Sequence, residues 1–234
     1  MTYDAPMSAD QSSGKEVEFK VPVGDEGDFV ALAESLGASL EGARTALQEN
    51  HFFDTASGDL RAAGYSLRLR FEGDRRILTA KGAAAESDGA LKIRPEEEAE
   101  VDGADAERIL AGALSPLEAL IHALAPERAA LVDRIEEELG DGKLVHVGSF
   151  RNVRRYLGPV DVAGTDVTFE LDRTELPGGR IDHEFEVEVD EAVLDRFEPA
   201  LRELVDALGA QWTSVPSKLR RFYEALETND ASDD

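Results

Sequence analysis

The sequence has no cysteine, no long apolar run and few positive charges for its size. Cys 0 among 234 residues excludes thiol catalysis, thiolate metal sites and disulfides. No run of about 18 apolar residues is present, so a membrane-spanning helix is not expected. Any metal must then be held by carboxylate or imidazole groups, which favours hard ions such as Mg²⁺ or Mn²⁺.

Positive charge is scarce relative to negative charge. Fifty Asp and Glu face 25 Lys and Arg, which gives a formal net charge of -25. Such a chain repels nucleic-acid phosphates unless its cations gather in one place, so we expect no nucleic acid as main ligand. The acidic excess is typical of adaptation to high salt, a halophilic character. The polar N-terminal stretch lacks a secretory apolar segment, so we expect a cytoplasmic protein without a membrane partner.

Turn residues and periodicity predict a strand-rich single domain. We expect disordered acidic tails at residues 1–13 and 228–234 and one folded domain over 14–227. Helical patterns fall at 26–36, 104–124, 126–139, 191–208 and 217–227, and a loop is expected at 82–90. Period-two patterns predict strands at 15–22, 47–54, 65–72, 75–82, 90–101, 143–150, 151–158, 166–173 and 181–190.

The polar positions of several strands carry full charges. Glu16, Glu18 and Lys20 share one face of their strand. The same parity places Arg68 with Arg70 on one face, and Thr79 with Lys81 on another. It also recurs in three further charged strands, Lys92–Glu100, Glu170–Asp172 and Glu184–Glu188.

Two interpretations account for this pattern. The charges are either the solvated face of an open antiparallel sheet or the lining of a barrel that holds a ligand. The signs are segregated, because Glu16 and Glu18 share one strand while Arg68 and Arg70 share another. Like charges at positions i and i+2 repel, so an external partner should neutralise each cluster. A metal ion suits the carboxylates and a polyanion suits the arginines.

These segments resemble, in the same order, the motifs of the CYTH superfamily, the triphosphate tunnel metalloenzymes. That superfamily groups inorganic and thiamine triphosphatases, class IV adenylyl cyclases and tunnel-type RNA triphosphatases. The resemblance covers about residues 15–225 and rests on these segments: EVEFK (16–20), QENHFFDT (48–55), LRLR (67–70), TAK (79–81), EEEAE (96–100), GSFRNVRRY (148–156), FELD (169–172), EFEVE (184–188) and SVPSKLRRF (214–222).

The resemblance implies a mainly β (α+β) fold, an eight-stranded antiparallel β-barrel tunnel with helices packed outside. It implies metal-dependent hydrolysis of inorganic, thiamine or nucleoside triphosphate, in a monomer or homodimer. The alternatives are a class IV-type adenylyl cyclase that makes cyclic AMP from ATP, and a non-catalytic polyphosphate- or nucleotide-binding module. The cofactor would be Mg²⁺ or Mn²⁺.

The resemblance also assigns roles to residues. Glu16, Glu18, Lys20 and Lys81 are expected to be catalytic. Substrate binding is expected of Lys20, Arg68, Arg70, Lys81, Arg94, Arg154 and Lys218. Metal binding is expected of Glu16, Glu18, Glu98, Glu100, Asp172, Glu184 and Glu186, and Glu170 and Glu188 are further candidates for metal contact or water positioning.

Two points of register stay open at this stage. Either Arg151 or Arg154 faces inward, since one bulge would exchange them, and the family's N-x-R pattern favours Arg154. Pro95 interrupts hydrogen bonding within its strand, so the parity of Glu96 to Glu100 is open to a shift.

Overall fold

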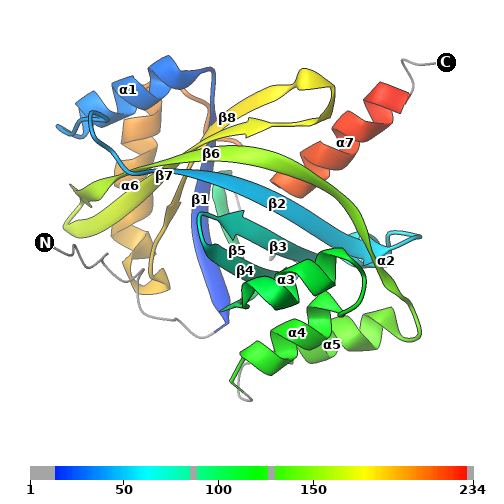
Figure 1. Ribbon diagram of the computed structural model, residues 1–234. Helices are drawn as coiled ribbons and strands as arrows, with labels where there is room; N and C mark the ends of the chain where they lie inside the picture. The colour runs from blue at the N-terminus through cyan, green and yellow to red at the C-terminus, as the bar shows by residue number, and fades with distance from the viewer. Residues whose placement is uncertain (1–13, 85–88, 126–129, 231–234) are drawn as a thin grey trace, which may run out of the picture.

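The computed structural model describes residues 14–84, 89–125 and 130–230. Its centre is a closed barrel in which the strand order is β1-β5-β4-β3-β2-β6-β7-β8 (Figure 1). Every neighbouring pair is antiparallel. The strands are β1 (Lys15–Val23), β2 (Thr45–Thr55), β3 (Ser66–Glu72), β4 (Arg75–Lys81), β5 (Leu91–Glu100), β6 (Leu144–Val162), β7 (Thr165–Glu175) and β8 (Ile181–Glu188).

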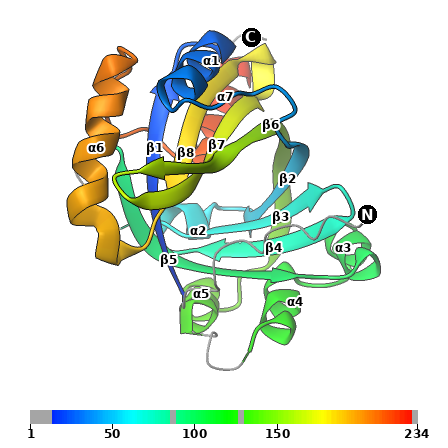
Figure 2. The ribbon, with the colours of Figure 1, turned by 90° about the vertical axis from the view of Figure 1, so that its left-hand side faces the viewer.

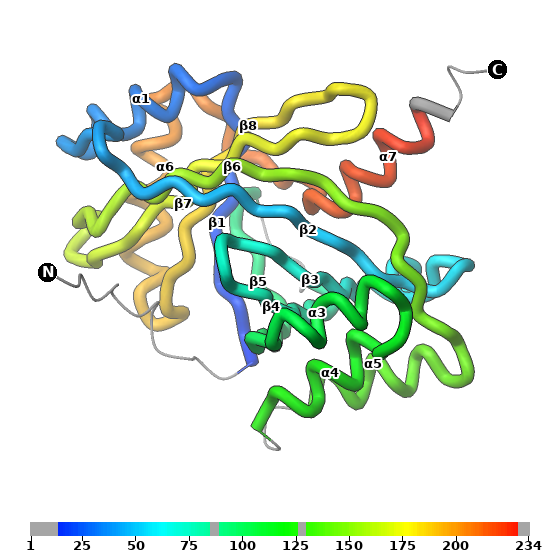
Figure 3. Tube along the Cα trace, in the orientation of Figure 1, coloured from blue at the N-terminus to red at the C-terminus, as the bar shows by residue number. Residues whose placement is uncertain are grey.

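The predicted eight-stranded antiparallel barrel is therefore confirmed, but the division of one strand was wrong. The segments 143–150 and 151–158 were predicted as two strands, whereas β6 is one strand of 19 residues. The strand continues past residue 150 without a break, and its pairing with β2 contains one register shift, at Phe52/Phe53 (Figure 3). The bulge absorbs the extra residue while the pairing goes on.

Helices surround the barrel on two sides (Figures 1 and 2). One side is covered by α1 and α6, and the opposite side by α3, α4 and α5, while α7 lies at one end. The helices are α1 (Glu26–Ser35), α2 (Asp59–Ala62), α3 (Gly103–Leu110), α4 (Pro116–Ala123), α5 (Ala130–Leu139), α6 (Leu194–Ala207) and α7 (Lys218–Asp230), with 3-10 turns η2 (Pro177–Gly179) and η3 (Glu191–Val193). None of the described helices is both long and apolar enough to cross a bilayer.

Two helix predictions need correction. The helix predicted over 104–124 is two helices, because Gly112 adopts a positive φ and Ser115 with Pro116 starts a new N-terminus. The short α2 had not been predicted, since four residues carry too little periodicity. The tail was predicted to begin at residue 228, but α7 continues to Asp230. Residues 126–129 of one predicted helix, residues 1–13 and 231–234 of the predicted tails, and part of the 82–90 loop lie outside the described residues.

The apolar core lies between the barrel wall and the helices. Phe19, Phe169 and Phe185 point outward from three strands and pack with Phe29 of α1 and Phe197 of α6. A second cluster joins β2, β3 and β4 to α3, α4 and α5. Since odd-numbered positions of β1 supply this core, the even-numbered positions must face the barrel interior. The fold thus directs charged side chains inward.

Candidate functional site

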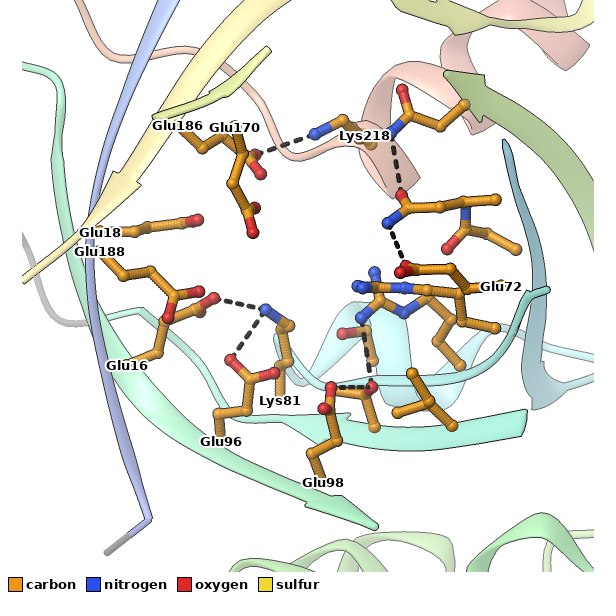
Figure 4. Close-up of a pocket in the computed structure, with 18 of the residues that line it drawn as sticks. Glu16, Glu18, Glu72, Lys81, Glu96, Glu98, Glu170, Glu186, Glu188 and Lys218 are labelled. Atoms are coloured by element: carbon orange, nitrogen blue, oxygen red, sulfur yellow. Dashed lines mark hydrogen bonds and ion pairs between the residues drawn. The ribbon is translucent and has the colours of Figure 1, made fainter. Parts of the chain in front are cut away.

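The barrel encloses a cavity of about 820 Å³ lined mainly by charged and amide side chains. Its size falls in the range of pockets that hold small molecules. Glu16, Glu18 and Glu188 approach from one side, and Glu72 lies on the opposite side (Figure 4). The lining thus includes most of the residues that the sequence assigned to a site, and it draws them from β1, β3, β4, β5, β6, β7, β8 and the start of α7.

Three buried carboxylates meet around one lysine. Asp172, Glu184 and Glu186 each offer an oxygen within 4.8 Å of the others. The Lys218 ammonium lies 2.7, 2.6 and 2.9 Å from oxygens of these three groups. Burial alone would raise the pKa of Asp172, but Arg154 and Lys218 hold it at about 2. This carboxylate cluster already pairs with a cation of the chain itself, Lys218.

Arginines complete the neutralisation of that cluster. Arg154 donates to Asp172 at 2.8 and 2.6 Å and to Glu186 at 2.7 Å. Arg221 of α7 donates to Glu184 at 2.6 Å. Arg221 had not been predicted as a site residue. It follows Lys218 by three residues, about one helical turn, so both side chains lie on the same face of α7. Together these contacts attach α7 to the barrel wall.

The carboxylates of β1 are paired with cations of β4 and β5. Glu16 accepts hydrogen bonds from Lys81 at 2.6 Å and from Arg94 at 2.5 Å. Arg94 also donates to Glu18 at 3.0 Å. Lys81 bridges to Glu96 as well, at 2.9 Å. The sequence placed these residues on inward faces, and the barrel closure brings them into contact.

Lys20 lies between the two groups of carboxylates. Its ammonium is 2.5 Å from Glu186 and 3.6 Å from Glu18. Burial alone would lower the pKa of Lys20, but the charges of Glu18 and Glu186 raise it above its ordinary value. Lys20 therefore remains a cation at every pH at which the protein would work.

Arg68 and Arg70 on β3 differ from all these cations. Within the described part of the chain, neither guanidinium has a carboxylate within ion-pair distance, and both Nε atoms are buried without a hydrogen-bond partner. Among the residues that the structure describes, the Arg68 side chain donates to the Thr79 hydroxyl alone, at 3.1 Å. Burial, and next the charge of Arg70, lower the pKa of Arg68 to about 9. Two half-buried like charges in one cavity, with no carboxylate at ion-pair distance among the described residues, favour the binding of an anion.

Glu188 marks a surplus of negative charge near β1. Burial raises the pKa of this carboxyl group to about 7, and the Glu16 and Glu96 carboxylates add to the rise. Glu188 is exposed toward the cavity, where a divalent cation would relieve that repulsion. The absence of cysteine in the sequence agrees with a hard ion.

Glu98 and Glu100, also predicted as metal ligands, continue the same face of β5. Glu98 accepts a hydrogen bond from Thr79 at 3.1 Å. Glu100 pairs with Arg75, and its side chain is 56% exposed. Both line the cavity, but Glu100 lies at its rim, away from the buried carboxylates.

The structure settles both questions of register. Arg154 is buried among carboxylates, whereas Arg151 is exposed on the outer face of β6. Pro95 pairs with Lys15 without a shift, so Glu96, Glu98 and Glu100 keep inward positions. The neighbouring β1 begins at this pair, and the Pro95 carbonyl still accepts a hydrogen bond from the Gly82 N–H at 2.8 Å.

Amide side chains form a wall that the sequence analysis missed. Asn152 donates to Gln48 at 3.0 Å and to Asp172 at 2.8 Å, and Gln48 donates to Glu72 at 2.8 Å. Asn50 is also buried, and its Oδ1 has no partner among the described residues. These neutral residues follow the same even parity as the charged ones, which is the signal that would have identified them.

Comparison with known proteins agrees with this architecture. The profile of the CYTH domain matches residues 14–223, and the chain belongs to the CYTH family. A proposed adenylyl cyclase of Hippeastrum, whose structure reveals a dominant triphosphatase activity, is 27% identical at a TM-score of 0.69, over 89% of this chain and 95% of that one. A proposed adenylate cyclase of Bacillus halodurans is 21% identical at a TM-score of 0.64, over 90% of this chain and 99% of that one. No match was found among curated proteins.

Proposed function

We propose that the chain hydrolyses a triphosphate with Mg²⁺ or Mn²⁺ inside the barrel. The observation that carries this proposal is the pair of half-buried arginines, Arg68 and Arg70, whose buried Nε atoms have no hydrogen-bond partner among the described residues and which lie in the same cavity as a surplus of carboxylates. A polyanion with a bound divalent cation would neutralise both at once. The similarity to the Hippeastrum protein, with its dominant triphosphatase activity, supports the same reaction.

In this proposal, cations of the cavity bind the phosphates and carboxylates of the cavity bind the metal ion. Arg68 and Arg70 would bind phosphate oxygens, joined by Lys20, Lys81 and Arg154 as these release their carboxylates. A phosphate oxygen is a strong acceptor for guanidinium groups, which bind it through two hydrogen bonds. Held this way, the triphosphate is aligned for attack on its terminal phosphorus, and the cations stabilise the charge that develops in the transition state.

Glu16, Glu18, Glu186 and Glu188 would hold the divalent ion. The ion when bound supplies charge neutralisation and activation of water. Asp172 and Glu184, by contrast, do not line the cavity and are held by Arg154, Lys218 and Arg221, so they are assigned here to positioning. The overall reaction breaks one P–O bond of a phosphoanhydride, and the attacking water becomes part of the released phosphate.

The test is phosphate release from inorganic triphosphate, thiamine triphosphate and ATP with Mg²⁺, with Mn²⁺ and with EDTA. We expect release with either metal and none with EDTA, and Glu18→Gln should abolish it without loss of the folded state. The matched control is Glu198→Gln on α6, outside the barrel, which should keep full activity. No release from any triphosphate under these conditions would refute the proposal.

Cyclic AMP is measured in the same ATP reaction. In a cyclase the ribose hydroxyl attacks in place of water, so the product separates the two activities. We expect orthophosphate and no cyclic AMP; the reverse would assign the barrel to the cyclase alternative. Binding of triphosphate without either product would assign it to the non-catalytic alternative.

A further inference from the structure

An arginine lies over a tyrosine ring at one end of the cavity. The guanidinium carbon of Arg44 is 3.8 Å from the centroid of the Tyr156 ring. Both side chains meet Glu72, the tyrosine hydroxyl at 3.4 Å and the guanidinium at 3.5 Å. All three residues line the cavity. The group therefore forms an aromatic position next to the charged interior.

The Tyr156 ring lies next to the cations that are proposed to bind the phosphates. Tyr156 follows Arg154 by two residues on the inward face of β6, and Glu72 follows Arg70 by two on β3. Residues two apart on a strand are separated by roughly 6–7 Å. A group attached to a phosphate chain held by Arg70 and Arg154 would thus reach the Tyr156 ring.

The other aromatic residues that line the cavity are already engaged. Phe52 and Phe150 contact each other at 5.3 Å between ring centroids, and both contact Phe222 of α7. The Tyr156 face, in contrast, is covered by Arg44, whose side chain is 61% exposed. Its partner Glu72 is buried but keeps the hydrogen bond from Gln48 at 2.8 Å when Arg44 turns away, so Arg44 leaves this face at little cost.

The Tyr156 ring is held in place, whereas the Arg44 side chain above it is able to move. Tyr156 donates its backbone N–H to the Arg44 carbonyl at 2.9 Å, which holds the two backbones together. The ring is half-buried, whereas the Arg44 side chain extends into solvent. A stacking surface is therefore held in place beneath a side chain that is free to turn away.

We propose that the Tyr156 face binds an aromatic ring carried by the triphosphate, and that Arg44 covers this face when no such ring is present. The inference rests on the proposed function and narrows its substrate class to triphosphates with an aromatic substituent, such as a nucleoside triphosphate. The ring would replace the guanidinium on Tyr156. Stacking of a base on an aromatic side chain tolerates many ring types, so the position selects for a ring and not for one base.

The test compares kcat/KM for ATP with kcat/KM for inorganic triphosphate, as a ratio. We expect Tyr156→Leu to lower the ratio about ten-fold, since only ATP loses a stacking partner. Tyr156→Phe keeps the ring and should hold the ratio within about two-fold of wild type. Arg44→Ala removes the competing group and should raise the ratio about two- to three-fold.

A second arginine–tyrosine stack provides the control. Arg61 lies 4.2 Å from the Tyr223 ring centroid, outside the cavity. Tyr223→Leu and Arg61→Ala should leave the ratio unchanged. If Tyr156→Leu lowers both kcat/KM values equally, or leaves both unchanged, the inference is wrong while the triphosphatase proposal stands.

The aromatic position remains testable if the wild-type protein shows no hydrolysis. If wild type hydrolyses neither substrate, the proposed function fails, and calorimetric binding of ATP and of inorganic triphosphate in EDTA replaces the kinetic ratio. A ten-fold loss of ATP affinity in Tyr156→Leu, with unchanged triphosphate affinity, then supports the aromatic position. Equal ATP affinity in wild type and Tyr156→Leu would overturn the aromatic position.

Discussion

The two kinds of charge inside this barrel differ in their partners. On β7 and β8, Asp172, Glu184 and Glu186 form ion pairs with Arg154, Lys218 and Arg221. On β3, Arg68 and Arg70 have no carboxylate partner in the part of the chain that the structure describes. The first region is buried and the second half-buried, and both line or adjoin the same cavity.

The difference separates charges that support the fold from charges that await a ligand. Breaking a buried ion pair leaves an uncompensated charge, which is strongly destabilising. A buried cation without a partner is instead a cost that the folded chain carries until an anion binds. Mutations on the two sides should therefore have opposite effects on stability and activity.

The largest effect is expected on the unpaired side. The double variant Arg68→Met, Arg70→Met should lose about 1,000-fold or more in kcat/KM for inorganic triphosphate, because it removes two preorganised donors. Its free energy of unfolding should stay equal to that of wild type or rise, since two desolvated charges disappear. Steady-state kinetics and urea unfolding measure the two quantities. A double variant with near-normal kinetics would contradict the assignment of the anion site.

The paired side should respond mainly in stability. Asp172→Asn leaves Arg154 and Lys218 with fewer carboxylates and should lower the free energy of unfolding by about 3 kcal/mol. The control is Glu100→Gln in the rim pair with Arg75, measured in the same urea titration. Equal stability of Asp172→Asn and wild type would show that this cluster is not a support of the fold.

The pH dependence of stability should report the same cluster. The folded-state pKa of Asp172, about 2, lies below its ordinary value of 3.8. The stabilisation from this group is therefore present above pH 4 and is lost as the pH falls toward 2, by roughly 2 kcal/mol. Thermal unfolding between pH 5 and pH 2 should show a shallower slope for Asp172→Asn than for wild type. Parallel slopes would contradict the paired assignment.

The smallest effect is expected at the exposed rim. Glu100→Gln removes a pair in which both side chains are more than half exposed, so stability should change by less than about 0.5 kcal/mol. Activity should also stay within about two-fold, because Arg75 is not part of the anion site. A large loss of activity in this variant would extend the site to the rim, as the sequence-based prediction of Glu100 as a metal ligand implies.

The sequence predicted the direction of these side chains better than their pairing. Period-two alternation placed Glu16, Glu18 and Lys20 on one face, and the barrel confirms that this face is interior. The contact of Arg94 with both Glu16 and Glu18 depends on the register between β1 and β5. No local pattern encodes that register, so the partners were not predictable.

The neutral residues of the site and the site arginine on α7 were also missed in the sequence analysis. Gln48, Asn50 and Asn152 obey the same alternation but carry no charge to attract attention. Arg221 lies on a helix, where its approach to Glu184 depends on how α7 packs against the barrel end. Only the closed barrel shows which cations are already neutralised and which are free.

The most direct test of this account is calorimetric binding of inorganic triphosphate in EDTA. Wild type, the Arg68→Met, Arg70→Met double variant and Asp172→Asn are compared, each after its folded fraction is checked by urea unfolding. The account predicts at least a 100-fold loss of affinity in the double variant, equal to about 2.8 kcal/mol, with undiminished stability. Equal triphosphate affinity in wild type and the double variant would contradict it.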